Sequence, residues 1–229
     1  MKKQCTFYGL GELVAADKSV TAKLLISRTI LHLPKVGTII IDPKQGKDFC
    51  YEGAYRGENA PLGLKKAFEI FQKRKSGEDE NDNLIIVFID EFQSLINLLP
   101  TKKIKGDDDT FTRGEAQEML NLLVALSRSY SMSIQCATQQ PNSQVFGGTS
   151  SREQFGFIGC LFGKSGGGGS ETLSMLFDTE SCKIIKNFGS INGRGGFVAV
   201  NGGTVIPVRV PKVNDMQKMN DIISSSILK

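Results

Sequence analysis

The sequence predicts an α/β fold with a mostly parallel central sheet and helices on both of its faces. Residues 84–89 form an apolar run typical of a fully buried parallel strand. Other short apolar runs alternate with helical patterns along the chain. The 229 residues, 40% hydrophobic and 23% charged, can enclose a substantial core, and we expect residues 1–229 to form a single domain.

In the first half of the chain we expect helices over 24–33, 62–75 and 92–99 and strands over 37–41 and 84–89. The apolar residues of the helix over 62–75 recur at helical spacing. Pro34 and Pro100 end the first and last of these helices, because proline lacks the N–H that a helix interior needs. The strand over 37–41 leads into Asp42, Pro43 and Lys44.

In the second half we expect helices over 115–129, 171–177 and 214–228 and strands over 132–138 and 157–162. The segment 101–110 has adjacent basic and acidic blocks, which are typical of a surface loop. Runs rich in β-branched residues over 196–200 and 204–210 flank Asn201-Gly202-Gly203. This pattern predicts a C-terminal β-hairpin.

Two adjacent carboxylates, Asp90 and Glu91, directly follow the apolar strand over 84–89. Burying them is costly unless a metal, a water or a cationic group compensates their charge. In P-loop proteins that hydrolyse nucleotides, the first acid helps to hold Mg²⁺ and the second can polarise the attacking water. The alternative is an ordinary acidic helix N-terminus, where carboxylates favour the helix dipole. Both interpretations stay open at this point.

A phosphate loop of the pattern G-x-x-x-x-G-K-[ST] should precede such an acidic strand. The candidate in position is Lys18-Ser19, but Glu12 and Asp17 stand where the two glycines should be. Lys18 is therefore either a phosphate ligand in an altered or shortened loop or a surface lysine. A second candidate, Gly159 to Ser165 with Lys164, is one residue too short and lies partly within an apolar strand.

Composition excludes several other classes of protein. No stretch approaches the roughly 20 apolar residues of a membrane span, and the N-terminus lacks the apolar core of a signal peptide, so we expect a cytoplasmic protein. Cys136 and Cys160 lie in apolar runs and are expected to be reduced core thiols. The single His32 argues against a histidine metal site or a Ser-His-Asp triad. A net charge of +4 permits nucleic-acid contact without requiring it.

Several short blocks together resemble the FtsK/SpoIIIE branch of the FtsK–HerA ATPases. The most similar members are the DNA-pumping or coupling proteins of Gram-positive conjugative elements. The matching blocks are residues 18–21, residues 39–44, the strand that ends in Asp90-Glu91, residues 137–141, residues 151–156, and residues 195–197 through 208–211. The acidic strand followed by Ala137-Thr138-Gln139-Gln140-Pro141 is the most specific of these.

The resemblance implies a RecA-like P-loop ATPase core that forms rings, usually hexamers, around double-stranded DNA. Such a core translocates DNA with ATP and Mg²⁺ in conjugative transfer, segregation or genome packaging, together with membrane-anchored or transfer-apparatus partners. Its DNA contacts would be mostly to phosphates, through loop residues such as Lys102, Lys103 and Lys105. The missing glycines leave a second hypothesis, a catalytically impaired DNA- or partner-binding subunit. A small-molecule nucleotide enzyme is a third.

The resemblance also implies roles for individual residues. Nucleotide would be bound by Lys18, Ser19 and Asp90, and Mg²⁺ would be held through Ser19 and Asp90. Glu91 would activate water, and Gln139 would sense the terminal phosphate or position that water. Arg152 would act as an arginine finger on a neighbouring subunit's nucleotide, unless it is an ordinary surface arginine.

Overall fold

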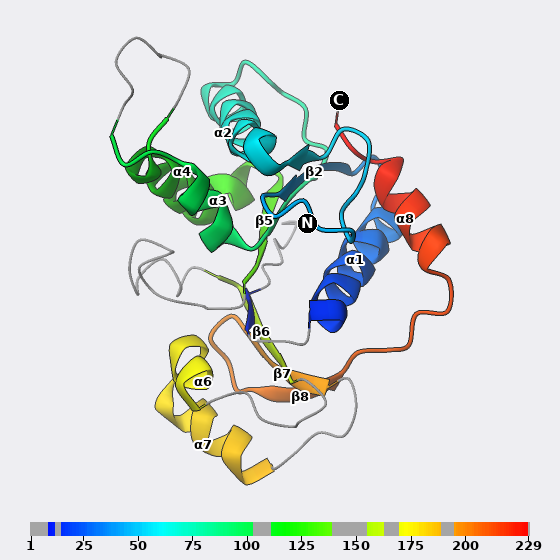
Figure 1. The fold of residues 1–229 in the computed structure, drawn as a ribbon, viewed down its shortest axis with the longest axis vertical. Coiled ribbons are helices and arrows are strands. Elements are labelled where there is room, and N and C mark those ends of the chain that lie inside the picture. The colour runs from blue at the N-terminus through cyan, green and yellow to red at the C-terminus, as the bar shows by residue number, and fades with distance from the viewer. Residues whose placement is uncertain are drawn as a thin grey trace.

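The structure, a computed structural model, describes residues 9–11, 15–102, 111–138, 155–162, 170–188 and 195–228 (Figure 1). Its strands are β1 (Gly9–Gly11), β2 (Gly37–Asp42), β3 (Tyr55–Arg56), β4 (Ile85–Asp90), β5 (Met132–Ala137), β6 (Phe157–Phe162), β7 (Gly195–Val200) and β8 (Ile206–Arg209). Its helices are α1 (Ala15–His32), α2 (Ala60–Ser76), α3 (Phe92–Leu98), α4 (Arg113–Leu126), α6 (Ser170–Leu176), α7 (Thr179–Phe188) and α8 (Met216–Ser224).

The described strands form one eight-stranded sheet in the order β3-β2-β4-β5-β1-β6-β7-β8. The strands from β3 to β6 in this order run parallel, whereas β7 and β8 pair antiparallel. The predicted α/β class, mostly parallel sheet and C-terminal hairpin are therefore confirmed. The hairpin is slightly shorter than expected, because β8 begins at Ile206 and ends at Arg209.

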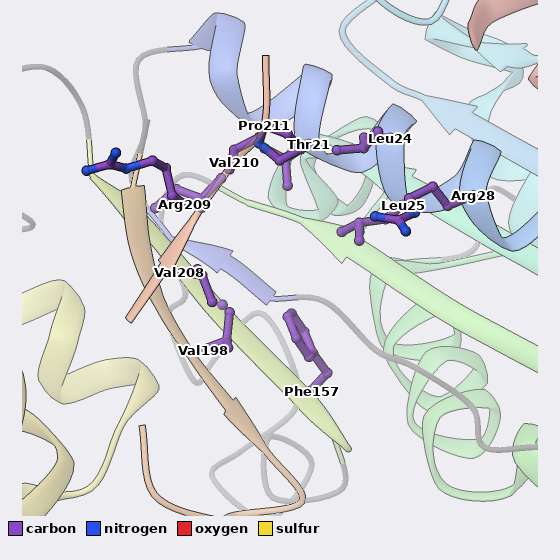
Figure 2. Close-up of a pocket in the computed structure, with 12 residues that line it drawn as sticks. Thr21, Leu24, Leu25, Arg28, Phe157, Val198, Val208, Arg209, Val210 and Pro211 are labelled. Carbon is purple, nitrogen blue, oxygen red and sulfur yellow. The ribbon is translucent and has the colours of Figure 1, made fainter. Parts of the chain in front are cut away.

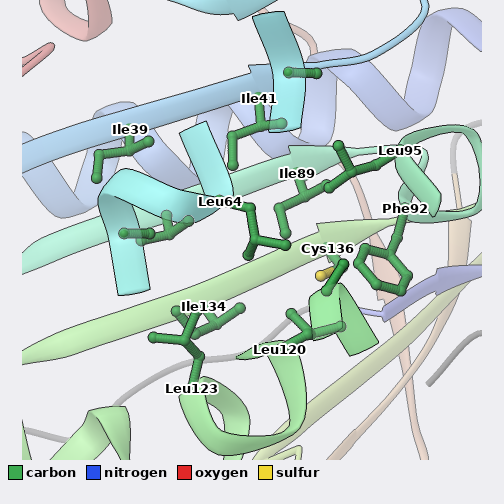
Figure 3. Close-up of a cluster of buried hydrophobic side chains, with 14 of the residues drawn as sticks. Ile39, Ile41, Leu64, Ile89, Phe92, Leu95, Leu120, Leu123, Ile134 and Cys136 are labelled. Carbon is green, nitrogen blue, oxygen red and sulfur yellow. The ribbon is translucent and has the colours of Figure 1, made fainter. Parts of the chain in front are cut away.

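Helices cover both faces of the parallel strands, as predicted (Figure 1). Alternate residues of β4 point to opposite faces, because successive side chains of a strand alternate. Val87 and Ile89 pack with residues of α2, α3 and α4 in one apolar cluster (Figure 3). Ile86 and Phe88 pack with residues of α1 and α8 in a second cluster. A continuous apolar run is required here because β4 is buried on both faces.

Some boundaries and elements differ from the prediction. Helix α1 begins at Ala15 and not at residue 24. The prediction missed its first turns because they contain polar residues that do not follow an apolar pattern but are buried in the folded protein. Lys18, Thr21 and Lys23 are all buried. The two-residue strand β3 and the helix α7 have no counterpart in the prediction.

Local chemistry explains where two of the helices lie. Thr112 and Glu115 form a capping box at the start of α4: Glu115 N–H donates to Thr112 Oγ1 at 3.3 Å, and Thr112 N–H donates to Glu115 Oε2 at 2.7 Å. Gly63 lets α2 approach the sheet closely, since a Cβ at this position would lie 2.8 Å from atoms of both Ile41 and Tyr55. Helix α2 thus packs directly over the β2–β3 edge.

At the amino-terminal edge of the parallel strands, the buried Arg74 joins three segments. Its guanidinium donates to the carbonyls of Tyr130 at 2.9 Å, Asn83 at 3.1 Å and Ser131 at 3.2 Å. It also forms an ion pair with Asp79 at 3.2 Å. These bonds attach the end of α2 to the residues that precede β4 and β5.

The end of the described chain pairs with β2. Thr38 N–H donates to Ser226 O at 2.8 Å, and Leu228 N–H donates to Thr38 O at 2.9 Å. The hydroxyls of Thr38 and Ser226 lie 3.0 Å apart. Residues 226–228 therefore lie against β2, although 188 residues separate Thr38 from Ser226.

Among the described helices, none has both the length and the apolar character needed to cross a membrane. Cys136 and Cys160 are free and buried, as the sequence predicts.

Candidate functional site

The ends of three parallel strands meet at one level of the sheet. Leu10 of β1 is paired with Ala137 of β5, and Ala137 is paired with Asp90 of β4. Helix α1 begins at Ala15, shortly after β1 ends, so its first turn lies at the same carboxyl edge. Ligands of open α/β sheets bind at this edge, which makes it the place to look for a site.

Lys18 of α1 meets both acidic residues at this edge. Its Nζ lies 3.4 Å from Asp90 Oδ1 and 3.4 Å from Glu91 Oε2, although 73 residues separate Lys18 from Glu91. The side chains of Lys18 and Glu91 are each only 5% exposed. An ammonium buried between two carboxylates compensates their charge. The interpretation of Lys18 as a surface lysine is therefore wrong.

Glu91 has an unusual backbone and several partners. Its φ of 60° lies in the left-handed region, which costs an L-residue free energy unless its surroundings hold it. Its N–H donates to Ala137 O at 2.7 Å, and Thr138 Oγ1 donates to its Oε1 at 3.0 Å. Lys44 Nζ also lies 3.4 Å from its Oε2.

Glu91 is the N-cap residue of α3, but its side chain makes no capping hydrogen bond. The carboxylate instead contacts Lys18, Lys44 and Thr138, which come from three other segments. The alternative of an ordinary acidic helix N-terminus therefore does not describe this side chain.

The turn that follows β2 contributes a further charged pair. Asp42 is fully buried, and Arg56 Nε of β3 donates to its Oδ2 at 3.3 Å. Arg56 also donates to Gly46 O at 2.7 Å. Asp42 therefore has a structural partner, and Arg56 holds the turn that follows β2.

Asp90 has the properties of a ligand for a cation. Burial raises the pKa of its carboxyl above the ordinary value; the ammonium of Lys18 opposes this shift, and the negative charge of Asp42 adds to it. Within the described residues, the buried oxygens Asp90 Oδ1, Asp42 Oδ1 and Gln135 Oε1 have no hydrogen-bond partner, although Asp90 Oδ1 has the long ion pair with Lys18. A buried carboxylate oxygen without such a partner fits a hard divalent cation.

The described residues hold no group of three His, Cys, Asp or Glu side chains that could enclose a metal by themselves. Mg²⁺ sites in phosphoryl-transfer proteins typically use one or two carboxylates and complete the shell with substrate phosphates and waters. Asp90, with Ser19 buried beside Lys18, fits a site of that kind.

The structure brings Lys18, Asp90 and Glu91 together and buries Ser19 next to Lys18. Gln139 and Arg152 lie outside the described residues, as do Lys103, Lys105 and Lys164, the residue Glu12 and the side chain of Asp17. The sequence interpretation did not assign Thr138 and Lys44 to the site. Thr138 directly follows β5, and Lys44 lies two residues after the end of β2, so both lie just beyond strands at the carboxyl edge. This position was the signal that could have found them.

A pocket of about 200 Å³ lies apart from these charges, between α1 and the strands β6 to β8 (Figure 2). Leu24, Phe157 and Val208 are among the mainly apolar side chains that line it. Its lining includes Arg28 and Arg209 but no acidic residue. This composition does not suit metal binding, so the charged edge is the better candidate site.

Comparison with known proteins gives no match to a family model and no match among curated proteins. Solved structures do match. The pCW3 conjugation coupling protein TcpA, in its monomer form with ATPγS, is 18% identical with a TM-score of 0.69; the match covers 98% of this chain and 65% of that chain. The cytoplasmic domain of the Thermomonospora curvata type VII secretion ATPase EccC is 12% identical with a TM-score of 0.64, over 96% of this chain and 27% of that one.

The genome packaging NTPase B204 from Sulfolobus turreted icosahedral virus 2, in complex with AMP, is 13% identical with a TM-score of 0.53. That match covers 93% of this chain and 100% of the packaging NTPase. The chain thus spans 27% of the EccC chain and 65% of the TcpA chain. In its fold, this chain resembles the RecA-like core of FtsK/SpoIIIE-type ATPases, as the sequence blocks predict.

Proposed function

We propose that this chain is an ATP-driven motor core that moves DNA, in conjugative transfer, segregation or genome packaging. The observation that carries the proposal is the meeting of Lys18 with Asp90 and Glu91, with Nζ 3.4 Å from an oxygen of each. A nucleotide-hydrolysing site of the P-loop type needs one lysine and two acids at the carboxyl edge of a sheet. The fold of the chain supports the same proposal, as do the ATPγS in the TcpA structure and the AMP in the packaging NTPase structure.

In this proposal Lys18 binds the phosphates from the first turn of α1, where free backbone N–H groups also favour an anion. Glu91 accepts a proton from the attacking water. The water oxygen then bonds to the terminal phosphorus while the bond to the bridging oxygen breaks, which yields ADP and phosphate. Gln139 would position the water, and Arg152 would reach the site of a neighbouring subunit.

Ser19 and Asp90 are the residues that would hold Mg²⁺. The cation would neutralise charge on the phosphate oxygens. It would also favour the ionised form of Asp90, whose pKa burial raises.

Calorimetric titration with ATPγS and Mg²⁺ tests the nucleotide site. We expect Lys18→Ala to weaken binding by at least about tenfold, which corresponds to about 1.4 kcal/mol. Asp90→Asn should weaken binding only in the presence of Mg²⁺. The control is Lys183→Ala, since Lys183 is exposed on α7 and pairs with Glu180. Equal affinities for wild type, Lys18→Ala and Lys183→Ala would rule out this site.

DNA translocation has a separate test. Phosphate release should rise when double-stranded DNA is added, and DNA affinity should fall steeply with salt, because phosphate contacts release counterions. Arg152→Ala should reduce hydrolysis and leave nucleotide binding intact, since an arginine finger acts on a neighbouring subunit. A wild type that stays monomeric with DNA and nucleotide, or that binds one DNA sequence with little salt dependence, would contradict a ring-shaped motor.

A catalytically impaired DNA- or partner-binding subunit is the second candidate. Two observations favour it: acidic residues replace the loop glycines at positions 12 and 17, and the cations Lys18 and Lys44 already neutralise Glu91. Asp17→Gly should tighten ATPγS binding if the loop is an altered phosphate loop, because it removes a negative charge and restores backbone freedom. If neither Asp17→Gly nor Lys18→Ala changes affinity, the impaired subunit is the better description.

A further inference from the structure

Lys44 reaches a buried carboxylate from the solvent side of the site. Its Nζ lies 3.4 Å from Glu91 Oε2, and its side chain is 45% exposed whereas that of Glu91 is 5% exposed. Ion pairs between two exposed side chains contribute little to stability, and their geometry is seldom fixed. Here one partner is buried, so the lysine extends from the surface toward the interior of the site.

The turn that carries Lys44 is held at both of its ends. Arg56 donates to the Asp42 carboxylate at 3.3 Å before Lys44 and to Gly46 O at 2.7 Å after it. Pro43 restricts φ of the residue directly before Lys44. Asp42 itself is fully buried. The backbone at Lys44 is therefore fixed relative to the sheet, and only the lysine's long side chain has freedom to move.

Two ammonium groups meet at one oxygen of Glu91. Lys18 Nζ and Lys44 Nζ each lie 3.4 Å from Oε2, while Thr138 Oγ1 donates to Oε1 at 3.0 Å. Both carboxylate oxygens are thus engaged. Three donors therefore occupy most of the acceptor positions of this carboxylate, and an attacking water has to compete with them before Glu91 can accept its proton.

The two lysines differ in what else holds them. The side chain of Lys18 is 5% exposed, and its Nζ also lies 3.4 Å from Asp90 Oδ1. Lys44 is the more exposed of the two, on a four-carbon side chain that allows an ammonium to change partners. A terminal phosphate offers three acceptor oxygens and more negative charge than a carboxylate, so an ammonium gains contacts by moving to it.

We propose that Lys44 is a second phosphate-binding lysine, whose ammonium moves from Glu91 to the terminal phosphate of a nucleoside triphosphate and so frees Glu91 to accept the water proton. This inference rests on the proposed nucleotide site. In the candidate phosphate loop, Glu12 and Asp17 replace the glycines that let a backbone surround phosphates. Lys44 lies outside this loop and would supply a further positive charge for the phosphates. A diphosphate lacks the group that Lys44 recognises and leaves the Lys44–Glu91 pair in place.

Calorimetric titrations with ATPγS and with ADP, both with Mg²⁺, test the inference. Lys44→Met keeps most of the aliphatic stem and removes the charge. We expect it to weaken ATPγS binding by about tenfold or more and to change ADP binding by less than about twofold. Lys44→Arg keeps the charge and should restore most of the ATPγS affinity. The control is Lys47→Met, since Lys47 is exposed in the same loop, and it should bind both nucleotides as the wild type does.

Unchanged ATPγS affinity in Lys44→Met, or an equal loss for both nucleotides, would overturn the inference. Faster ATP turnover with unchanged ATPγS affinity would also overturn it, because Lys44 would then only restrain Glu91. Lys18→Ala in the same titrations separates the two proposals, since it should weaken both nucleotides. If Lys18→Ala weakens the binding of both nucleotides and Lys44→Met weakens neither, only the role of Lys44 is wrong. A wild type that binds neither nucleotide overturns both proposals.

Discussion

Two buried cations lie at opposite edges of the same parallel strands, and they are paired in different ways. Arg74 at the amino-terminal edge donates to the carbonyls of Tyr130 and Asn83 at 2.9 and 3.1 Å. Lys18 at the carboxyl edge lies 3.4 Å from an oxygen of Asp90 and of Glu91. Good N–H···O bonds are 2.7–3.2 Å long, so the contacts of Arg74 are short and those of Lys18 are long.

Burial alone therefore does not separate a structural cation from one that we propose to bind a ligand. Arg74 is 7% exposed and Lys18 is 4% exposed. The Lys18 edge nevertheless has two buried carboxylate oxygens, Asp42 Oδ1 and Asp90 Oδ1, without a hydrogen-bond partner among the described residues. Its four hydrogen bonds to three segments indicate that Arg74 holds those segments together. The long contacts at Lys18 leave capacity for a ligand, and the two edges should respond differently to substitution.

The largest effect on stability should come from Arg74→Met. This change removes four hydrogen bonds, three to partly buried carbonyl groups and one to Asp79, and we expect the free energy of unfolding to fall by about 3–5 kcal/mol. Urea denaturation measures it. Arg128→Met is the control, because Arg128 is exposed nearby and its loss should cost less than about 0.5 kcal/mol. A fall below about 1 kcal/mol for Arg74→Met would contradict a structural role.

Glu91→Gln tests the opposite edge by keeping shape and removing charge. Phosphate release should slow by at least about 100-fold, or about 2.7 kcal/mol at the barrier, because the change removes the proposed general base. Binding of ATPγS should persist. The assay compares phosphate release with calorimetric affinity in one preparation. If the wild type hydrolyses ATP and Glu91→Gln releases phosphate at the same rate, Glu91 is not the general base.

Lys18→Met should cost less stability than Arg74→Met, about 1–2 kcal/mol. The cost is limited because Asp90, whose pKa burial already raises, can take up a proton when its ammonium partner is removed. Glu91 also keeps Lys44 and Thr138. The same urea denaturation applies, and equal losses for Lys18→Met and Arg74→Met would break the contrast between the two edges.

The smallest effect concerns a third buried cation, Lys23, whose Nζ lies 5.4 Å from the ring centroid of Phe49. Burial lowers its pKa below the usual 10.5, and the charge of Asp48 opposes this shift. Below pH 10.5 the unfolded chain therefore binds more protons than the folded one, so this group's contribution to stability rises with pH.

Unfolding measured at pH values from about 8 to 10 checks the prediction for Lys23. The wild type should gain stability relative to Lys23→Met as pH increases. The comparison with the variant is needed because other groups also titrate. A difference that is independent of pH, or that falls as pH rises, would show that burial does not lower the pKa of Lys23.

The sequence predicted the elements whose pattern is local. The apolar run before Asp90 identified β4, and a glycine-containing turn identified the β7–β8 hairpin. It failed where distant contacts decide the conformation. The first turns of α1 contain Lys18 and Lys23, which suit solvent by themselves and are buried only through partners far along the chain.

The candidate site was predictable to a similar extent. Asp90 and Glu91 were identified because two carboxylates after an apolar strand need an explanation. The contacts that Lys44 and Thr138 make with one carboxylate depend on the left-handed backbone of Glu91, with φ of 60°. Such a conformation is rare for a glutamate, so no sequence pattern predicts it.

The contact between the end of the described chain and β2 has a consequence for folding. Thr38 and Ser226 are 188 residues apart, so forming this contact closes a long loop and costs conformational entropy unless the residues between them are already ordered. During synthesis, β2 and the turn after it emerge long before residues 226–228, and they can pair with this segment only after those residues have also left the ribosome. We expect this contact to form late, after the nearer strands have assembled.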